Sequence, residues 1–289
     1  VDIADSSKEE LSRMMVGRDV QLQVDKKPAN PGEVVLDVEN VTMHSAQHKK
    51  DAVRNVSLQV HAGEIVCLAG IEGNGQSELL EAVAGMRPYR GKITVNGTDV
   101  AGKTPGEIRK LGLSHVPEDR LSTGVDKDAS VSDNLLAGKE KEPEFSAHGI
   151  HLHPKAIRSY AQKLYEAFDI RGAGIDVTAG SLSGGNMQKV VIAREMSFGS
   201  QVLLIAQPTR GVDIGAIESI RSTLEDVKEK GLGVLLISAD LEELLSLSDR
   251  IVVMYEGKIS GRMDASEANE DNLGLLMMGG HDTTKEEHA

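Results

Sequence analysis

Five short apolar runs, separated by segments with helical patterning, constrain the fold of this chain more than any other feature. A strand that is apolar along its whole length is buried on both faces. Such strands alternating with helices predict an α/β fold with a mostly parallel sheet covered on both sides. The runs are EIVCLAG (64–70), LGLSHVP (111–117), QVLLIAQ (201–207), GVLLIS (233–238) and RIVVMY (250–255).

Shorter β-rich segments lie around the first of these runs. They are VVLDVENV (34–41), NVSLQVHA (55–62) and GKITVNG (91–97). The turns HAGE (61–64) and NGTD (96–99) suit hairpins. We therefore expect an antiparallel β subdomain in addition to the parallel sheet.

The stretch between the second and third apolar runs is too long to be an ordinary crossover. Residues 118–200 are largely polar and helical in pattern, and HPKAIRSYAQKLYEAFDI (153–170) is the clearest helix. We predict an inserted helical subdomain over about residues 119–198.

The two ends of the chain resemble each other. MMVG (14–17) and MMGG (277–280) each follow an acidic, Leu-containing stretch. The match is short enough for chance, but it also fits a preceding domain homologous to this one. The chain begins at Val1 rather than Met, and we expect a fragment. The expected organisation is the tail of a preceding domain (1–18), a linker (19–32), one large domain (33–280) and a disordered acidic tail (281–289).

The net charge, the cysteine content and the length of the apolar stretches argue against several classes of protein. The net charge of −13 argues against a nucleic acid as the main partner, because phosphate backbones require clustered Lys and Arg. The single cysteine, Cys67, excludes an internal disulfide, and its apolar surroundings predict a small buried side chain. No apolar stretch reaches the ~20 residues that span a bilayer.

Three histidines, His148, His151 and His153, lie close together before the helix at 153–170. Three imidazoles could bind zinc. No cysteine or fourth ligand is evident, so we interpret AHGIHLHP as a solvated loop.

The segment GIEGNGQSE (70–78) lies between a predicted strand and a predicted helix. Its spacing is that of the phosphate-binding loop G-x-x-x-x-G-K-[ST], except that Gln76 stands at the Lys position. Backbone N–H groups and the helix N-terminus would supply the positive field for a phosphate. The predicted binding residues are Gly70, Gly73, Asn74, Gly75, Gln76, Ser77 and Glu78.

A second glycine motif occurs in SLSGGNMQKVVIAREM, which begins at Ser181. Ser183, Gly184, Gly185 and Asn186 open a predicted helix whose N-terminal amides could bind an anion. The alternative is an ordinary N-cap serine followed by a tight glycine turn.

In the order of these motifs the chain resembles the ATP-binding domain of ABC transporters. That order is phosphate loop, LSGG signature, Walker B strand, D-loop and H-loop, and the resemblance covers residues 33–262. It implies a P-loop NTPase core with an antiparallel β subdomain and an inserted helical subdomain. It also implies ATP and Mg²⁺ as cofactors.

The chain departs from the family pattern at six positions. Family members that hydrolyse ATP carry Lys, Asp, Glu, His and Gln where this chain has Gln76, Ala206, Gln207, Ala239 and Glu118. The adenine-stacking aromatic expected near MHSAQH (43–48) is also absent. We therefore expect no catalytic residue here and only Ser77 as a weak magnesium ligand. Nucleotide binding at this loop stays open, since Glu72 and Glu78 add negative charge.

The signature, by contrast, matches the family. ABC ATP-binding domains pair head to tail, so Ser183 and Gly185 would complete the ATP site of a partner domain, with Asp213 of the D-loop joining the halves. We expect that partner to be an N-terminal ATP-binding domain of the same chain, since the similar chain ends fit a preceding homologous domain.

Further motifs indicate a branch of the ABC transporter family. VPEDR, LSGGN.QK and PTRGVDIGA resemble the second ATP-binding domain of bacterial importers for simple sugars and nucleosides. GNGQSE and LLIAQPTRG are most similar to the nucleoside importers. The resemblance implies a peripheral position at the cytoplasmic face of the cell membrane. It implies permease subunits, contacted through the helical subdomain and residues 118–135, and indirectly a solute-binding protein.

Two alternatives remain open at this point. One is a soluble ABC protein that acts on ribosomes or DNA, which the net charge disfavours. The other is a competent ATPase that uses unusual residues. On the favoured interpretation the isolated fragment is inactive.

Overall fold

The computed structural model describes residues 14, 26–45 and 50–280. These form two compact units, of which one contains 119–198 and 208–223 and the other contains 26–118, 199–207 and 224–280. We refer to the first as the helical unit and to the second as the sheet unit. The expected tail of a preceding domain (1–18), apart from Met14, and the expected disordered tail (281–289) lie outside the described residues.

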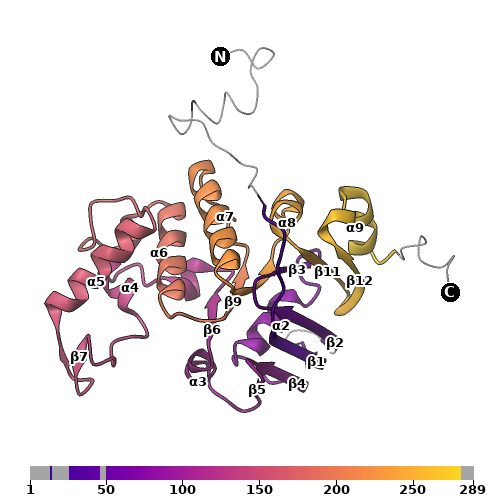
Figure 1. Ribbon diagram of the computed structural model, residues 1–289, viewed down its shortest axis with the longest axis horizontal. Coiled ribbons are helices and arrows are strands. Elements are labelled where there is room, and N and C mark those ends of the chain that lie inside the picture. Colours follow the sequence, from indigo (N-terminus) through magenta and orange to yellow (C-terminus); the bar gives the residue numbers. More distant parts are fainter. Residues whose placement is uncertain (1–13, 15–25, 46–49, 281–289) are drawn as a thin grey trace. The chain divides into compact units, whose positions relative to one another are not determined.

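The sheet unit contains a six-stranded sheet in the order β12-β11-β3-β10-β9-β6 (Figure 1). The five predicted apolar runs form its parallel strands, which confirms the expected α/β core. β12 was not predicted and pairs antiparallel with β11. The strands are β3 Ile65–Ala69, β6 Leu113–Val116, β9 Val202–Ala206, β10 Gly233–Ile237, β11 Arg250–Tyr255 and β12 Lys258–Asp264.

A second, four-stranded antiparallel sheet in the same unit has the order β2-β1-β4-β5. Its strands are β1 Val34–His44, β2 Asp51–His61, β4 Arg90–Val95 and β5 Thr98–Asp99. The NGTD hairpin is confirmed, because it joins β4 to β5. The HAGE hairpin is wrong. That turn leads from β2 into β3 of the other sheet, where Glu64 O accepts a hydrogen bond from Val234 N at 2.9 Å.

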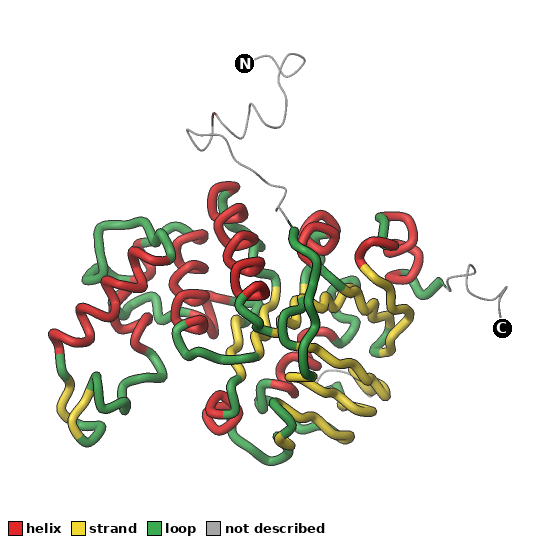
Figure 2. Tube along the Cα trace, viewed as in Figure 1, coloured by secondary structure: helices red, strands yellow, loops and turns green. Residues whose placement is uncertain are grey.

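Short helices accompany both sheets in the sheet unit. α2 packs against β2, α3 against β6, α8 against β3, and α9 against β11 and β12 (Figure 2). α7, Ile214–Glu229, begins in the helical unit and ends in the sheet unit. The other bounds are α2 Gln76–Val83, α3 Pro105–Lys110, α8 Leu241–Leu247, α9 Glu270–Met277 and a 3₁₀ turn at Ala265–Glu267.

Three helices pack against one another in the helical unit. Leu136, Phe145 and Ile157 form a hydrophobic cluster in the same unit. A π-helical turn at Arg120–Gly124 and a 3₁₀ turn at Ala179–Ser181 complete it. The helix predicted over 153–170 is present as α5. The elements are α4 Val131–Leu136, β7 Ser146–Ala147, β8 His151–Leu152, α5 Pro154–Ala167 and α6 Gly184–Met196.

Gly233, at the start of β10, marks a close approach between the two sheets. A Cβ there would lie 2.5 Å from Val35 Cγ2 and 2.7 Å from His61 O. The constraint is space rather than backbone conformation, because β10 is an ordinary buried strand at this residue.

We expect Gly233→Ala to lower the free energy of unfolding by about 1–3 kcal/mol, because the added methyl group overpacks this contact. Gly274→Ala in α9 is the matched control. Its Cβ would meet nothing within 4 Å, so it should raise stability by about 0.5–1 kcal/mol. Urea unfolding of the two variants and the parent measures both effects. Equal effects of the two substitutions would contradict the packing argument.

Glu64 is the buried member of an ionic cluster beside this contact. Its side chain is 1% exposed, and Arg250 donates to its two oxygens at 2.9 and 2.7 Å. The His61 backbone N–H donates to it at 2.6 Å. Burial opposes ionisation of Glu64, but the hydrogen bonds from Arg250 and His61 outweigh it, and its pKa lies below the usual value.

A lowered pKa in the folded state stabilises the protein above the unfolded pKa of about 4.3, and this stabilisation is lost as pH falls through the folded pKa. We therefore expect Glu64→Gln to be less stable than the parent at pH 7, by about 1–3 kcal/mol. The difference should shrink between about pH 5 and pH 3. Urea unfolding across this range tests it, with exposed Glu267→Gln as control. A difference independent of pH would exclude the ionised cluster as the cause.

Candidate functional site

The predicted phosphate loop connects β3 to α2 in the sheet unit, as the sequence indicated. Gly75 precedes the helix with φ 103°, in the left-handed region. A Cβ at Gly75 would lie 2.4 Å from Ala52 O. Glycine is therefore required here both by conformation and by space. The first turn of the helix is closed by Leu79 N, which donates to Gly75 O at 3.0 Å.

Gln76, at the family's Lys position, is turned back onto its own loop. Its side chain is buried, and Nε2 donates to Ile71 O at 3.3 Å. A Cβ on Gly70 would lie 2.2 Å from that Nε2, so the amide lies directly against Gly70. The side chain at this position is thus neutral and held within the loop.

Asn74 fastens the loop to the turn between β11 and β12. Asn74 Oδ1 accepts from Glu256 N at 2.7 Å, and Asn74 O accepts from Gly257 N at 3.0 Å. Asn74 Nδ2 donates to Ile71 O at 3.0 Å. The sequence placed Asn74 among the binding residues but gave no sign of this bracing role, since the β11–β12 turn lies far away in the chain.

Ser77 and Glu118 bind each other. Ser77 Oγ donates to Glu118 Oε2 at 2.8 Å. A hydroxyl and a carboxylate are oxygen ligands of the kind Mg²⁺ uses. Ala206 stands where the family's metal-binding Asp would be, and Gln76 where the family has Lys. The residues present therefore offer two oxygen donors, on Ser77 and Glu118, without the cation and the Asp of the family pattern.

Gln207 and Ala239, at the positions of the family's Glu and His, are also joined. Ala239 N donates to Gln207 Oε1 at 3.2 Å, and Gln207 N donates to Ile237 O at 2.7 Å. Gln207 has φ 47°, an uncommon conformation for this residue type. Asp240 next to Ala239 caps α8, accepting from Glu242 N at 2.9 Å. All these groups belong to the sheet unit.

The signature motif begins α6 in the helical unit. Ser183 is the N-cap and accepts from Asn186 N at 3.4 Å and from Asn186 Nδ2 at 2.9 Å. Asn186 Oδ1 accepts from Arg171 N at 2.7 Å. The N-cap interpretation is therefore confirmed. It is compatible with anion binding, because Ser183 is exposed and a 13-residue helix follows it.

Both signature glycines are needed for packing. A Cβ at Gly184 would lie 2.9 Å from Arg120 Nη2 and 3.0 Å from Gly211 O. A Cβ at Gly185 would lie 2.6 Å from Ala216 Cβ and 2.7 Å from Asp213 Oδ2. Substitutions at these glycines therefore disturb the fold as well as any ligand contact.

Asp213 and Arg120 organise the segment that faces these glycines. Asp213 Oδ1 accepts from Ala216 N at 2.9 Å at the start of α7. Arg120 donates to Arg210 O at 2.7 Å and to Gly211 O at 3.0 Å. Sequence reasoning placed Asp213 with the signature but missed Arg120, which lies in VPEDR far from it in the chain.

The histidine cluster shows the geometry of a surface hairpin. His151 pairs with Ala147 in the β7–β8 ladder, and His153 Nδ1 lies 3.0 Å from Glu144 O. Over the residues that the structure describes, no three His, Cys, Asp or Glu side chains are placed to hold a metal. Cys67 is buried as predicted, and burial raises the pKa of its thiol. Within the same residues no helix could cross a membrane.

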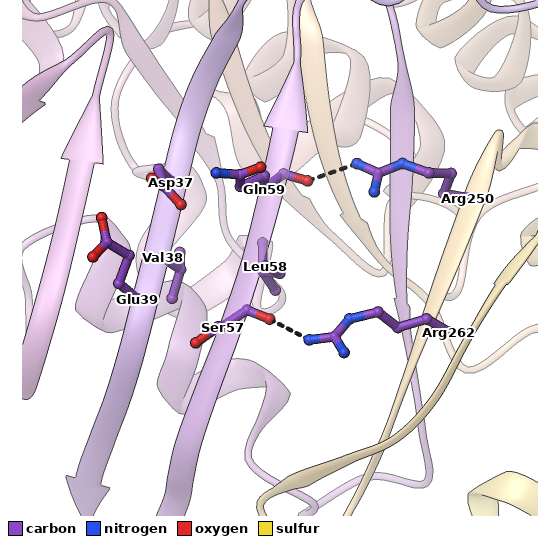
Figure 3. A pocket seen from close by; sticks show the side chains of 8 residues that line it. All are labelled: Asp37, Val38, Glu39, Ser57, Leu58, Gln59, Arg250 and Arg262. Atoms are coloured by element: carbon purple, nitrogen blue, oxygen red, sulfur yellow. Dashed lines mark hydrogen bonds between the residues drawn. The ribbon is translucent and has the colours of Figure 1, made fainter. Parts of the chain in front are cut away.

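A surface pocket of about 430 Å³ in the sheet unit contains none of the predicted site residues (Figure 3). Arg250 donates to Gln59 O at 2.8 Å, and Arg262 donates to Ser57 O at 2.7 Å. Both carbonyls belong to β2, an edge strand. The guanidinium groups of β11 and β12 therefore join the six-stranded sheet to the edge strand β2 of the other sheet. The lining residues are Asp37, Val38, Glu39, Ser57, Leu58, Gln59, Arg250 and Arg262.

Comparison with known proteins gives consistent matches. Residues 53–210 match the ABC transporter family. The chain is 44% identical over 287 residues to the glucose import ATP-binding protein TsgD13 of Haloferax volcanii, covering 98% of this chain and 52% of that protein. It is 41% identical over 280 residues to the guanosine import ATP-binding protein NupO of Bacillus subtilis, covering 96% and 54%. The chain thus spans about half the length of these curated relatives.

A solved structure supports the fold. The crystal structure of a nucleotide-free ATP-binding cassette from an ABC transporter superposes with a TM-score of 0.70 at 24% identity, covering 84% of this chain and 95% of that one. This confirms the predicted P-loop NTPase architecture.

If the loop's internal bonds prevent magnesium-nucleotide binding, the double substitution Gln76→Lys with Glu118→Gln should restore it. The change supplies a cation and removes the carboxylate charge beside Ser77. We expect at least about tenfold tighter binding of Mg-ATP, the effect of one charge-assisted contact. Calorimetry of parent and variant measures it, with Gln76→Lys plus exposed Glu33→Gln as the matched control. Equal affinities in all three proteins would refute the internal-bond explanation.

Proposed function

This chain belongs to the ABC transporter family, and on that premise we propose that it is a nucleotide-binding domain of an importer for nucleosides or simple sugars. Two matched relatives are named as import ATP-binding proteins for glucose and for guanosine, which supports this solute class. We propose further that residues 33–280 form the second ATP-binding domain of a longer chain, with 1–18 as the tail of the first. The half-length coverage of the relatives supports this division.

The observation that carries the proposal is a contrast between the two motifs. At the phosphate loop, Gln76 bonds to Ile71 O and Ser77 to Glu118, and after β9 Gln207 bonds to the Ala239 backbone. These three side chains are buried or partly buried. At the signature, Ser183 bonds to Asn186 but is exposed at the start of a helix. The first arrangement favours a degenerate site, and the second favours a signature available to a partner.

Energetics support the same asymmetry. Phosphoryl transfer depends on positioning and charge stabilisation. Each missing contact at the Lys, Asp, Glu and His positions is worth about 2–4 kcal/mol in a transition state, although such effects do not add. A site that lacks all four does not hydrolyse ATP at a useful rate. We therefore propose that ATP and Mg²⁺ act mainly in the composite site, where Ser183, Gly184 and Gly185 complete a nucleotide held by the partner.

The partners follow from this role. We propose the N-terminal ATP-binding domain of the same chain as the direct partner, and membrane-spanning permease subunits as the next. A solute-binding protein would act indirectly, and the domain would lie at the cytoplasmic face of the membrane. The whole protein, rather than this domain alone, would be the ATP-hydrolysing unit.

Ser183→Ala in the intact tandem protein tests the assignment. We expect ATPase activity to fall by about 10²-fold or more, in the range of losing one charge-stabilising donor. Thr104→Ala is the control, since Thr104 caps α3 in the sheet unit by accepting from Glu107 N at 3.4 Å. It should cost similar stability, about 1 kcal/mol, and leave activity nearly unchanged.

Gln76→Ala in the same protein should change ATPase activity little. A silent Ser183→Ala together with a severe Gln76→Ala would reverse the assignment of the two motifs. Magnesium-dependent turnover by the 289-residue chain alone would favour a competent ATPase instead.

A further inference from the structure

Residues 26–32, which precede β1, are fastened to the sheet unit; we name them the strap. Lys27 Nζ lies 2.7 Å from Glu229 Oε1 at the end of α7. Lys26 donates to Ser248 O and lies 3.7 Å from Asp249 Oδ1. At the other end of the strap, Gly32 N donates to Ala62 O at 2.8 Å. Both ends of the segment therefore contact the domain.

The strap also completes a buried ionic cluster. Lys228 is 3% exposed, and its Nζ lies 2.6 Å from Glu225 Oε2 and 3.6 Å from Asp249 Oδ1. The same Nζ donates to Lys27 O of the strap at 3.0 Å. A buried ammonium group requires several partners to offset the loss of water. The strap carbonyl is one of them, so its departure would leave Lys228 under-coordinated.

The cluster lies at one end of a helix whose other end meets the signature. α7 runs without interruption from Ile214 to Glu229. Its first turn contains Ala216, which with Asp213 packs against Gly185. The strap at the C-terminal end and the signature at the N-terminal end thus hold the same helix.

We propose that the strap is a docked connection which transmits movement of the preceding chain to α7, and through α7 to Gly185 and Asp213. This inference rests on the proposed function, because the movement would come from the partner ATP-binding domain. A freely hinged linker would let the two domains move independently. A docked strap instead makes the position of the signature depend on the segment before it.

Docking is tested in the 289-residue chain with a nitroxide on Asn30→Cys. Native Cys67 is fully buried and stays unlabelled. Glu225→Leu with Lys228→Met replaces the buried pair with apolar side chains, which preserves packing but removes the donor to Lys27 O. We expect the mobile fraction of the label to rise at least about tenfold, the effect of losing a hydrogen bond to a charged group. A label on Lys110→Cys in α3 should not change.

Two substitutions at an exposed ion pair test docking without changing the buried cluster. Lys27→Glu and Glu229→Lys should each raise label mobility by about two- to fivefold, and the double variant should restore the parent spectrum, since the ion pair is exposed. An immobile label in the Glu225→Leu, Lys228→Met chain, or no rescue by the charge swap, would overturn docking.

Transmission is tested in the intact tandem protein. We expect Glu225→Leu with Lys228→Met to lower ATPase activity at least about tenfold. This is the same factor by which these substitutions are expected to raise the mobile fraction of the strap. A mobile strap with unchanged ATPase activity would overturn transmission. Ser183→Ala in parallel separates the two proposals. If it is severe while the strap variant is silent, only the strap proposal fails; if it too is silent, the proposed function fails.

Discussion

Parallel pairing of β3 between β10 and β11 is the interaction on which the candidate site depends. Parallel strands bring their carboxyl ends to one edge of the sheet, where ligands bind in open α/β folds. The phosphate loop follows β3, Glu118 follows β6, Gln207 follows β9 and Ala239 follows β10. The hydrogen bonds Ser77–Glu118 and Gln207–Ala239 are possible because this pairing, continued by the parallel pairs β10–β9 and β9–β6, gathers four distant segments.

The parallel strands could be predicted because burial on both faces leaves a continuous apolar run in the sequence. β12 could not. It contains Gly261 among charged residues, and its place depends on α9, since a Cβ at Gly261 would lie 2.7 Å from Leu276 Cδ1. The HAGE turn was misassigned for a related reason. Its residues suit a hairpin, but the sheet that the next strand joins is decided by pairing with β10 and β11.

At the candidate site, the sequence identified the positions at which the chain departs from the family pattern. It did not show which groups the side chains at those positions contact. The direction of a side chain depends on its neighbours in the folded protein. Gln76 donates to Ile71 O, and Asn74 accepts from Glu256 N. Arg120 was missed because its partners, the Arg210 and Gly211 carbonyls, carry no side-chain signal. The Ser183 cap could be predicted because capping is local in sequence.

The loop shows how binding chemistry and loop geometry can be separated. Its shape depends on Gly75 against Ala52 O and on Asn74 at the β11–β12 turn, and neither contact involves a nucleotide. Its phosphate chemistry would depend on the side chain at position 76 and on the charge beside the Ser77 hydroxyl. The two sets involve different residues, so the contacts that shape the backbone of the loop do not themselves require a cation at position 76.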